Sequence, residues 1–138
     1  GNPPLHMMER PPLFTEETPI APADSYSVGK VWMEAYARML SFQNTGVSFT
    51  GLRIGVVRLN DNPADINDFS TAPNMIQPAK RFEKLWLFHE DLVQLAELCL
   101  VKSNGYQIYN TISQGPNASG VYIDITKAMT ELGFQPRN

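Results

Sequence analysis

The chain of 138 residues is long enough for one small domain and too short for two. Hydrophobic residues make up 43% of it and charged residues 18%, as in ordinary globular proteins, and the formal net charge of −3 argues against nucleic-acid binding. No apolar run approaches the roughly 20 residues of a membrane span, and the single Cys99 excludes an internal disulfide. These features predict a cytoplasmic domain that binds neither nucleic acid nor membrane.

The N-terminal part of the chain predicts a loop followed by a helix. Residues 1–23 hold six of the eleven prolines, and proline removes a backbone donor and disfavours helix in the residue before it. Asp24 or Ser25 can cap a helix over residues 25–43, in which apolar residues recur at spacings of three and four. We expect this stripe to face a core; it consists of Val28, Val31, Trp32, Ala35, Met39 and Leu40.

The middle of the chain predicts a buried strand and a long loop. Residues 46–58 form a nearly continuous apolar and β-branched run, which is typical of a strand buried on both faces of a parallel sheet. Residues 60–80 carry three prolines among Asn and Asp, and a loop of this length in a small domain is usually functional or disordered.

The C-terminal third predicts four further elements. Residues 81–88 predict a short strand, and residues 89–102 predict a helix with acidic residues in its first turn. Residues 105–112 alternate as a half-buried strand does. A short final helix is capped by Asp124 and ends at Gly133. Helices and strands in this order predict an α/β architecture.

Tyr26 and Lys30 stand four residues apart in the first predicted helix, so they share one face with Cβ atoms about 5–6 Å apart. The simplest interpretation is an exposed tyrosine beside a solvated lysine. The functional interpretation is an acid–base pair. A free phenol has a pKa near 10 and is a poor base at neutral pH. Bringing this pKa to about 7 takes about 4 kcal/mol, of which one ammonium about 5 Å away supplies about 3 kcal/mol at an effective dielectric constant of about 20. A further positive charge nearby would supply the rest, without a metal.

Five segments resemble, in order, the extended short-chain dehydrogenase/reductase family across residues 14–138. An acidic loop of the form Glu-x-x-Pro-x-x-Pro precedes the Tyr-x-x-x-Lys helix, and "LRIG" at 52–55 is similar to the strand that ends beside the nicotinamide. "LFHEDLVQLAELCL" is similar to a later family helix, and "DITKAMTELGFQP" to a C-terminal signature. "LRIG" and the spacing from Arg81 to Trp86 look most like the uronate dehydrogenase branch, although Val56 replaces the small hydroxyl residue of that branch.

This resemblance implies the C-terminal half of a Rossmann-like, doubly wound parallel sheet with a small substrate-binding lobe. Within one domain it implies a proline-rich loop over 1–23, the active-site helix and strand over 24–58, and a substrate-binding part over 59–138. The Gly-rich turn that cradles the pyrophosphate in the family, and its catalytic serine or threonine, have no counterpart here. We therefore expect a missing N-terminal half, on the same or a separate polypeptide.

The function that the resemblance implies is that of an NAD- or NADP-dependent oxidoreductase or epimerase. Its substrate would be a sugar, a sugar acid or a nucleotide-sugar. Tyr26 would transfer the proton of a substrate hydroxyl or carbonyl while a hydride moves to or from the cofactor. Lys30 would stabilise the phenolate and hold the ribose hydroxyls. The family also implies a homodimer, paired through the helix that carries this pair.

Further binding residues follow from the same resemblance. It assigns Ile54, Gly55 and Val56 to the cofactor site, together with Tyr26 and Lys30. It also gives Arg81 a bidentate contact with a substrate carboxylate. The alternative for Arg81 is a solvated base in the mixed-charge run "KRFEK".

Metal and cysteine chemistry find little support in the sequence. His6 and His89 lack a His-x-x-x-His spacing, so we expect no metal site. Cys99 falls on the apolar side of its helix and predicts a buried hydrophobic residue. A second function stays open: a non-catalytic, truncated remnant that acts as a binding or interaction module. The two functions differ in whether a Gly-rich N-terminal half exists.

Overall fold

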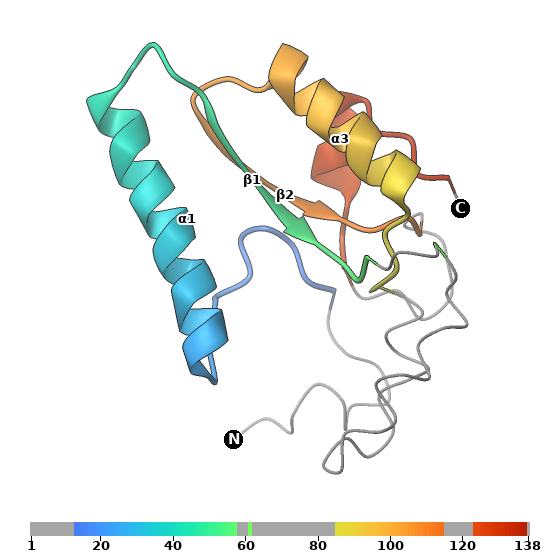
Figure 1. The fold of residues 1–138 in the computed structure, drawn as a ribbon, viewed down its shortest axis with the longest axis horizontal. Helices are drawn as coiled ribbons and strands as arrows, with labels where there is room; N and C mark the ends of the chain where they lie inside the picture. The colour runs from blue at the N-terminus through green and yellow to red at the C-terminus, as the bar shows by residue number, and fades with distance from the viewer. Residues whose placement is uncertain (1–12, 58–60, 62–84, 115–122, 138) are drawn as a thin grey trace.

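The protein is a mixed α/β structure built around a parallel pair of strands (Figure 1). This computed structural model describes residues 13–57, 61, 85–114 and 123–137. Within these ranges no helix is both long and apolar enough to cross a membrane. The elements in chain order are α1 (Ser25–Gln43), β1 (Phe49–Ile54), α3 (His89–Lys102), β2 (Tyr106–Thr111) and the π-helical turn η4 (Ala128–Leu132).

The two strands pair in parallel, and their register runs from Phe49 opposite Tyr106 to Ile54 opposite Thr111. The chain returns from β1 to β2 through α3, as parallel pairing requires a long crossover connection. Beyond β1, Val56 forms an isolated bridge with Trp86. Because the strands run in the same direction, their carboxyl ends lie at one edge of the sheet.

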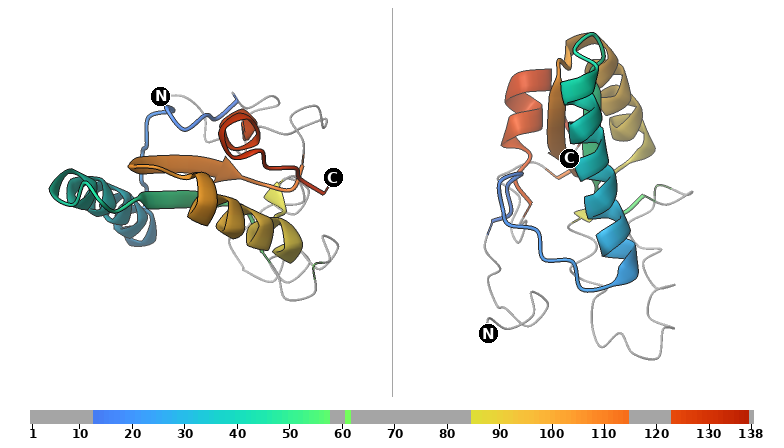
Figure 2. Two further views of the ribbon diagram at one scale, coloured as in Figure 1. Left: turned by 90° about the horizontal axis from the view of Figure 1, so that it is seen from above. Right: turned by 90° about the vertical axis from the view of Figure 1, so that its left-hand side faces the viewer.

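The hydrophobic core lies around α3, β2 and the C-terminal segment. Figure 2 shows α3 and η4 on opposite sides of the strand pair, with α1 at the end away from both. Leu95 of α3 and Leu132 of η4 are buried within the same cluster as Tyr109 and Ile112. Apolar burial in this cluster is the main stabilising term for the C-terminal half.

The helix bounds predicted from the sequence, 25–43 and 89–102, are confirmed. Asp24 caps α1 because its Oδ1 accepts the Ser27 N–H at 2.7 Å, and this hydrogen bond lowers the pKa of Asp24. The final helix also has its predicted ends. Asp124 Oδ1 accepts the Thr126 N–H at 2.8 Å, and Gly133 terminates the last turn with a φ of 75°.

The prediction that the first strand is buried on both faces is wrong. The residues of β1 are half-buried, except Ile54, which is 52% exposed. The buried strand is β2, which was predicted to alternate but is buried continuously from Ile108 to Thr111. The elements that cover each strand explain this difference: β2 supplies the buried Tyr109 to the core cluster, whereas β1 contributes only the half-buried Leu52 at its margin.

The expectation that the apolar stripe of α1 faces a core is also wrong for the described part of the chain. None of the residues of α1 is buried. Trp32 is 63% exposed and stacks on Tyr36, with 5.1 Å between the ring centroids. On α3, Leu100 is 88% exposed, and Cys99 is half-buried rather than buried. Partial burial raises the pKa of the Cys99 thiol.

Other predicted segments are described only in part. Residues 13–24 contain no helix or strand up to the start of α1, as their prolines predict, and Phe14 forms a single bridge with Ile123. The predicted loop over 60–80 lies outside the described residues except for Asp61, and so does the first half of the predicted strand over 81–88.

We predict that Gly55→Ala destabilises the protein by about 1–3 kcal/mol, as overpacking commonly does. A Cβ at this position would overlap the carbonyl oxygen of Leu85 and lie 2.9 Å from Cγ2 of Ile112. Gly29→Ala is the control, because a Cβ there meets nothing within 4 Å and alanine favours helix by about 0.5–1 kcal/mol. Urea unfolding measures the free energy of unfolding of both variants. A Gly55→Ala variant as stable as the unmodified protein would contradict the close approach at Gly55.

We predict that ionisation of Tyr109 lowers the free energy of unfolding at alkaline pH. Burial, together with its hydrogen bond to Glu131 at 3.0 Å, raises the pKa of Tyr109 to about 12. An unfolded tyrosine titrates near pH 10, so the unfolded state loses its proton first. The contribution of the Tyr109 hydroxyl to the stability of the folded state is therefore complete below about pH 10 and is lost between about pH 10 and 12.

The test is to measure the free energy of unfolding at about pH 9 and about pH 11. Tyr109→Phe should reduce the fall between these two values. Tyr36→Phe, which alters an exposed tyrosine of α1, should leave the fall as in the unmodified protein. An identical fall in all three proteins would show that another group titrates.

Candidate functional site

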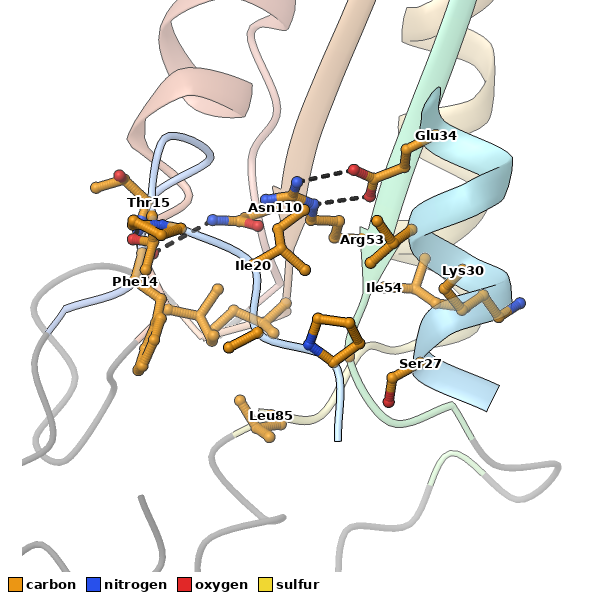
Figure 3. A pocket seen from close by; sticks show the side chains of 18 of the residues that line it. Phe14, Thr15, Ile20, Ser27, Lys30, Glu34, Arg53, Ile54, Leu85 and Asn110 are labelled. Carbon is orange, nitrogen blue, oxygen red and sulfur yellow. Dashed lines mark hydrogen bonds and ion pairs between the residues drawn. The ribbon is translucent and has the colours of Figure 1, made fainter. Parts of the chain in front are cut away.

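A cavity of about 500 Å³ opens at the carboxyl ends of β1 and β2 (Figure 3). Its walls come from the start of α1, the segment before α1, the ends of both strands, and the single residues Leu85 and Ile123. Ligands of open α/β sheets bind outside the carboxyl ends of parallel strands, so this is the expected place for a binding site.

Tyr26 and Lys30 form the rim of the cavity on α1. The Lys30 Nζ lies 5.2 Å from the centroid of the Tyr26 ring, so the predicted sharing of one helix face is confirmed. The contact is that of a cation over an aromatic face. Both side chains are exposed, Tyr26 by 73%, and Figure 3 shows the Lys30 ammonium pointing away from Arg53.

This rim separates the cavity from a second hollow of about 570 Å³ between α1 and β1. The second hollow is lined by every residue of β1 and by the face of α1 that carries Tyr26. The residues common to both hollows are Tyr26, Lys30, Glu34, Arg53 and Ile54. The tyrosine and lysine therefore stand on a ridge with concave surfaces on either side.

A bidentate ion pair lies deeper in the cavity wall. Arg53 of β1 donates from Nε and Nη2 to the two carboxylate oxygens of Glu34, both at 2.8 Å. Its Nη1 donates to the main-chain oxygen of Glu16 at 3.2 Å. The hydrogen bond with Glu34 raises the pKa of Arg53 further above neutrality, so the guanidinium stays charged.

The opposite wall is the segment before α1, which hydrogen bonds attach to β2. Glu16 Oε1 accepts the Asn110 N–H at 2.7 Å, and Asn110 Nδ2 donates to the Phe14 oxygen at 3.3 Å. The same Phe14 oxygen accepts the Asp124 N–H at 2.8 Å. A proline has no backbone N–H, so this proline-containing segment has fewer main-chain hydrogen bonds to offer. These contacts with Asn110 and Asp124 therefore fix its path across the strand ends.

The remaining predicted site residues divide into three cases. Ile54 and Gly55 line the cavity, at the end of β1 and just beyond it. Val56 pairs with Trp86 instead and does not belong to the described lining of either hollow. Arg81 lies outside the described residues.

Sequence reasoning missed Glu34, Arg53 and Asn110. For Glu34 a signal existed, because it follows Tyr26 and Lys30 at the same spacing of four and so extends their face by one turn. For Arg53 the signal was a charged residue inside an apolar strand, which needs a partner when it is partly buried. Asn110 carried no signal.

Candidate metal ligands do not gather in the described part of the chain, where no group of three or more His, Cys, Asp or Glu side chains could hold an ion. His89 pairs through Nδ1 with Asp61 at 2.8 Å, and Asp61 also accepts the His89 N–H at 3.0 Å. This pair anchors the start of α3. His6 lies outside the described residues.

Comparison with known proteins assigns no family to this chain. No family model, curated protein or solved structure matches it.

Proposed function

We propose that this chain is the C-terminal half of an NAD(P)-dependent dehydrogenase or epimerase of the extended short-chain type. Its substrate would be a sugar, a sugar acid or a nucleotide-sugar. The observation that supports this most is the position of Tyr26 and Lys30, which share one helix face at the rim of a cavity. That cavity opens at the carboxyl ends of a parallel strand pair, where cofactors of doubly wound sheets bind.

The proposed chemistry needs one proton and one hydride. In the oxidative direction the Tyr26 phenolate accepts the proton of a substrate hydroxyl while the carbon that bears it gives up a hydride. Reduction reverses both transfers, with the neutral phenol as the proton donor. Lys30 stabilises the phenolate because its ammonium lies beside the Tyr26 ring. Bound NAD(P) supplies the acceptor or donor of the hydride.

The described residues fit the nicotinamide end of such a cofactor. The Tyr26 hydroxyl and the Lys30 ammonium provide polar groups for ribose hydroxyls, and Ile54, 52% exposed, offers an apolar surface for a flat ring. Gly55 lets the backbone approach Leu85 without steric overlap. The sequence contains no Gly-rich turn for the pyrophosphate, so the N-terminal half would hold that part.

Two exposed surfaces are consistent with contacts to another polypeptide: the outer edge of β1 and the apolar side of α1. Among the described residues β1 pairs with β2 alone, which leaves its other edge open. α1 exposes several large apolar side chains, including Val28, Trp32 and Phe42. Extended apolar surfaces of this kind usually mark contacts with another chain. We propose that the missing half covers the β1 edge and that two subunits pair through α1.

A second candidate is the non-catalytic remnant that serves as an interaction module. The exposure of Tyr26 favours it, because a tyrosine that acts as a base works best where water is excluded. Measurement of turnover distinguishes the two candidate functions. An assay of the complete gene product with NAD⁺ or NADP⁺ and hexuronic acids or nucleotide-sugars gives NAD(P)H, for a dehydrogenase, or an epimerised sugar, for an epimerase, only in the first case.

Tyr26→Phe in the complete gene product should lower kcat by about 10²–10⁴, the usual cost of losing a general acid–base group. Cofactor affinity should fall by at most about tenfold, because one hydrogen bond to the ribose is lost while Lys30 and the aromatic ring are kept. NAD(P)H absorbance measures the turnover of a dehydrogenase, chromatography of the sugar product measures that of an epimerase, and fluorescence titration with NADH and NADPH measures binding.

The matched control is Tyr36→Phe, which removes a hydroxyl from the same helix outside the described lining of the cavity. It should leave kcat unchanged. If Tyr26→Phe turns over as fast as this control, the acid–base assignment is wrong.

The partner proposal predicts how residues 1–138 behave without the other half. The open β1 edge and the exposed side chains of α1 should make the isolated chain self-associate or aggregate. Sedimentation and thermal melting test this. A monomer with a cooperative transition near about 50–60 °C, typical of mesophilic domains, would show that the chain is self-sufficient.

A further inference from the structure

The ion pair between Arg53 and Glu34 joins both walls of the cavity to the sheet. Arg53 extends from β1, and its three guanidinium nitrogens all contact protein oxygens. Two of these contacts reach Glu34 on α1, and the third reaches the Glu16 carbonyl in the opposite wall. Three of the five N–H donors of Arg53 are therefore used to connect the two walls within the protein.

The contacts of Glu34 explain how α1 is held. In the described part of the chain, every hydrogen bond between α1 and the two strands is made by Glu34. Its carboxylate accepts from Arg53, and its main-chain oxygen accepts from the Tyr106 hydroxyl at 3.1 Å. The side chains of Glu34 and Arg53 are only 24% and 27% exposed, while no residue of α1 is buried. The apolar residues on this side of α1, Val31, Ala37 and Leu40, are only half-buried, so the pair adds the directional contact that fixes the rotation of the helix.

The spacing along α1 links this attachment to the proposed acid–base pair. Tyr26, Lys30 and Glu34 follow one another at intervals of four residues on one face, so the rotation that Glu34 fixes is also theirs. Glu34 lies about 12 Å along the helix from Tyr26 at 1.5 Å per residue. A helix that rotates or tilts at Glu34 therefore moves the phenol relative to the strand ends.

We propose that Arg53 and Glu34 are positioning residues, which set the rotation of α1 and the distance of Tyr26 and Lys30 from the opposite wall of the cavity. The proposal rests on the proposed function for its catalytic consequence. The attachment itself can be measured without turnover.

The structural arm of the test measures hydrogen exchange of α1 amides in the complete gene product. Glu34→Gln keeps the size of the side chain and removes its charge, and we expect about tenfold faster exchange over residues 26–30, within the range of coupling between contacting residues. Arg38→Gln is the matched control, because it removes a charge one turn further along α1 and outside the described lining of the cavity. Equal exchange in both variants would overturn the attachment.

The kinetic arm measures kcat, KM and the deuterium isotope effect of substrate oxidation, with whichever hexuronic acid or nucleotide-sugar the enzyme accepts. For Glu34→Gln we expect kcat to fall by about 10- to 100-fold, as small misplacements of catalytic groups do, with KM within about twofold. The isotope effect should rise because hydride transfer becomes slower than the other steps. A smaller amount of folded enzyme would lower the apparent kcat without changing the isotope effect, and that result would overturn the positioning role.

The charge-exchanged double variant Glu34→Arg/Arg53→Glu keeps the proposal testable if the single variants do not fold. It should restore folding and recover at least part of the turnover relative to either single variant. Restored folding without any recovery of turnover would overturn the positioning role. Failure of the proposed function has a different signature: the complete gene product shows no turnover, or Tyr26→Phe retains full turnover, while the exchange difference between Glu34→Gln and Arg38→Gln persists.

Discussion

The parallel pairing of β1 with β2 is the constraint on which the cavity depends. Parallel strands end at one edge, and the Gly55 N–H extends the pairing past β1 by donating to the Thr111 oxygen at 2.9 Å. Residues that follow the two strands, Gly55 and Ile112, therefore line the same cavity. The segment before α1 crosses this edge and closes the opposite side, attached through Asn110 of β2.

The two halves of the described structure are held by different forces. Around α3, β2 and η4, buried apolar side chains form a continuous core. α1 has no buried residue and is attached to the sheet by the polar contacts of Glu34. Partly exposed ion pairs contribute little to stability, on the order of 1 kcal/mol. The wall that carries Tyr26 and Lys30 is therefore the less stable part of the molecule, as is common for elements that bind ligands.

Local sequence signals predicted the helices well. The bounds of α1 and α3 follow from end signals such as the Asp24 cap and the acidic first turn of α3, and Gly133 marks the end of the last turn. The sequence predicted β1 as the buried strand, whereas β2 is the buried one. An apolar run shows that a strand can be buried, but which strand is buried depends on the elements that cover it, and the core covers β2.

Some contacts of the site follow from local sequence spacing, and others join residues that are far apart in the chain. Tyr26 and Lys30 are four residues apart, so helix geometry alone places them together. Arg53 and Glu34 are 19 residues apart on different elements, and Asn110 meets the segment before α1 across 94 residues. No local pattern predicts such contacts. They arise from parallel pairing, which brings distant segments to one edge of the sheet.

The most direct measurement is a crystal structure of the complete gene product with NAD⁺ or NADP⁺ bound. We propose that the ridge of Tyr26 and Lys30 binds the nicotinamide ribose at the carboxyl ends of β1 and β2. We therefore expect the ribose hydroxyls within hydrogen-bonding distance of the Lys30 Nζ and the Tyr26 hydroxyl, with the nicotinamide ring beside Ile54 and Gly55. A cofactor bound elsewhere, with this cavity filled by protein side chains, would contradict it.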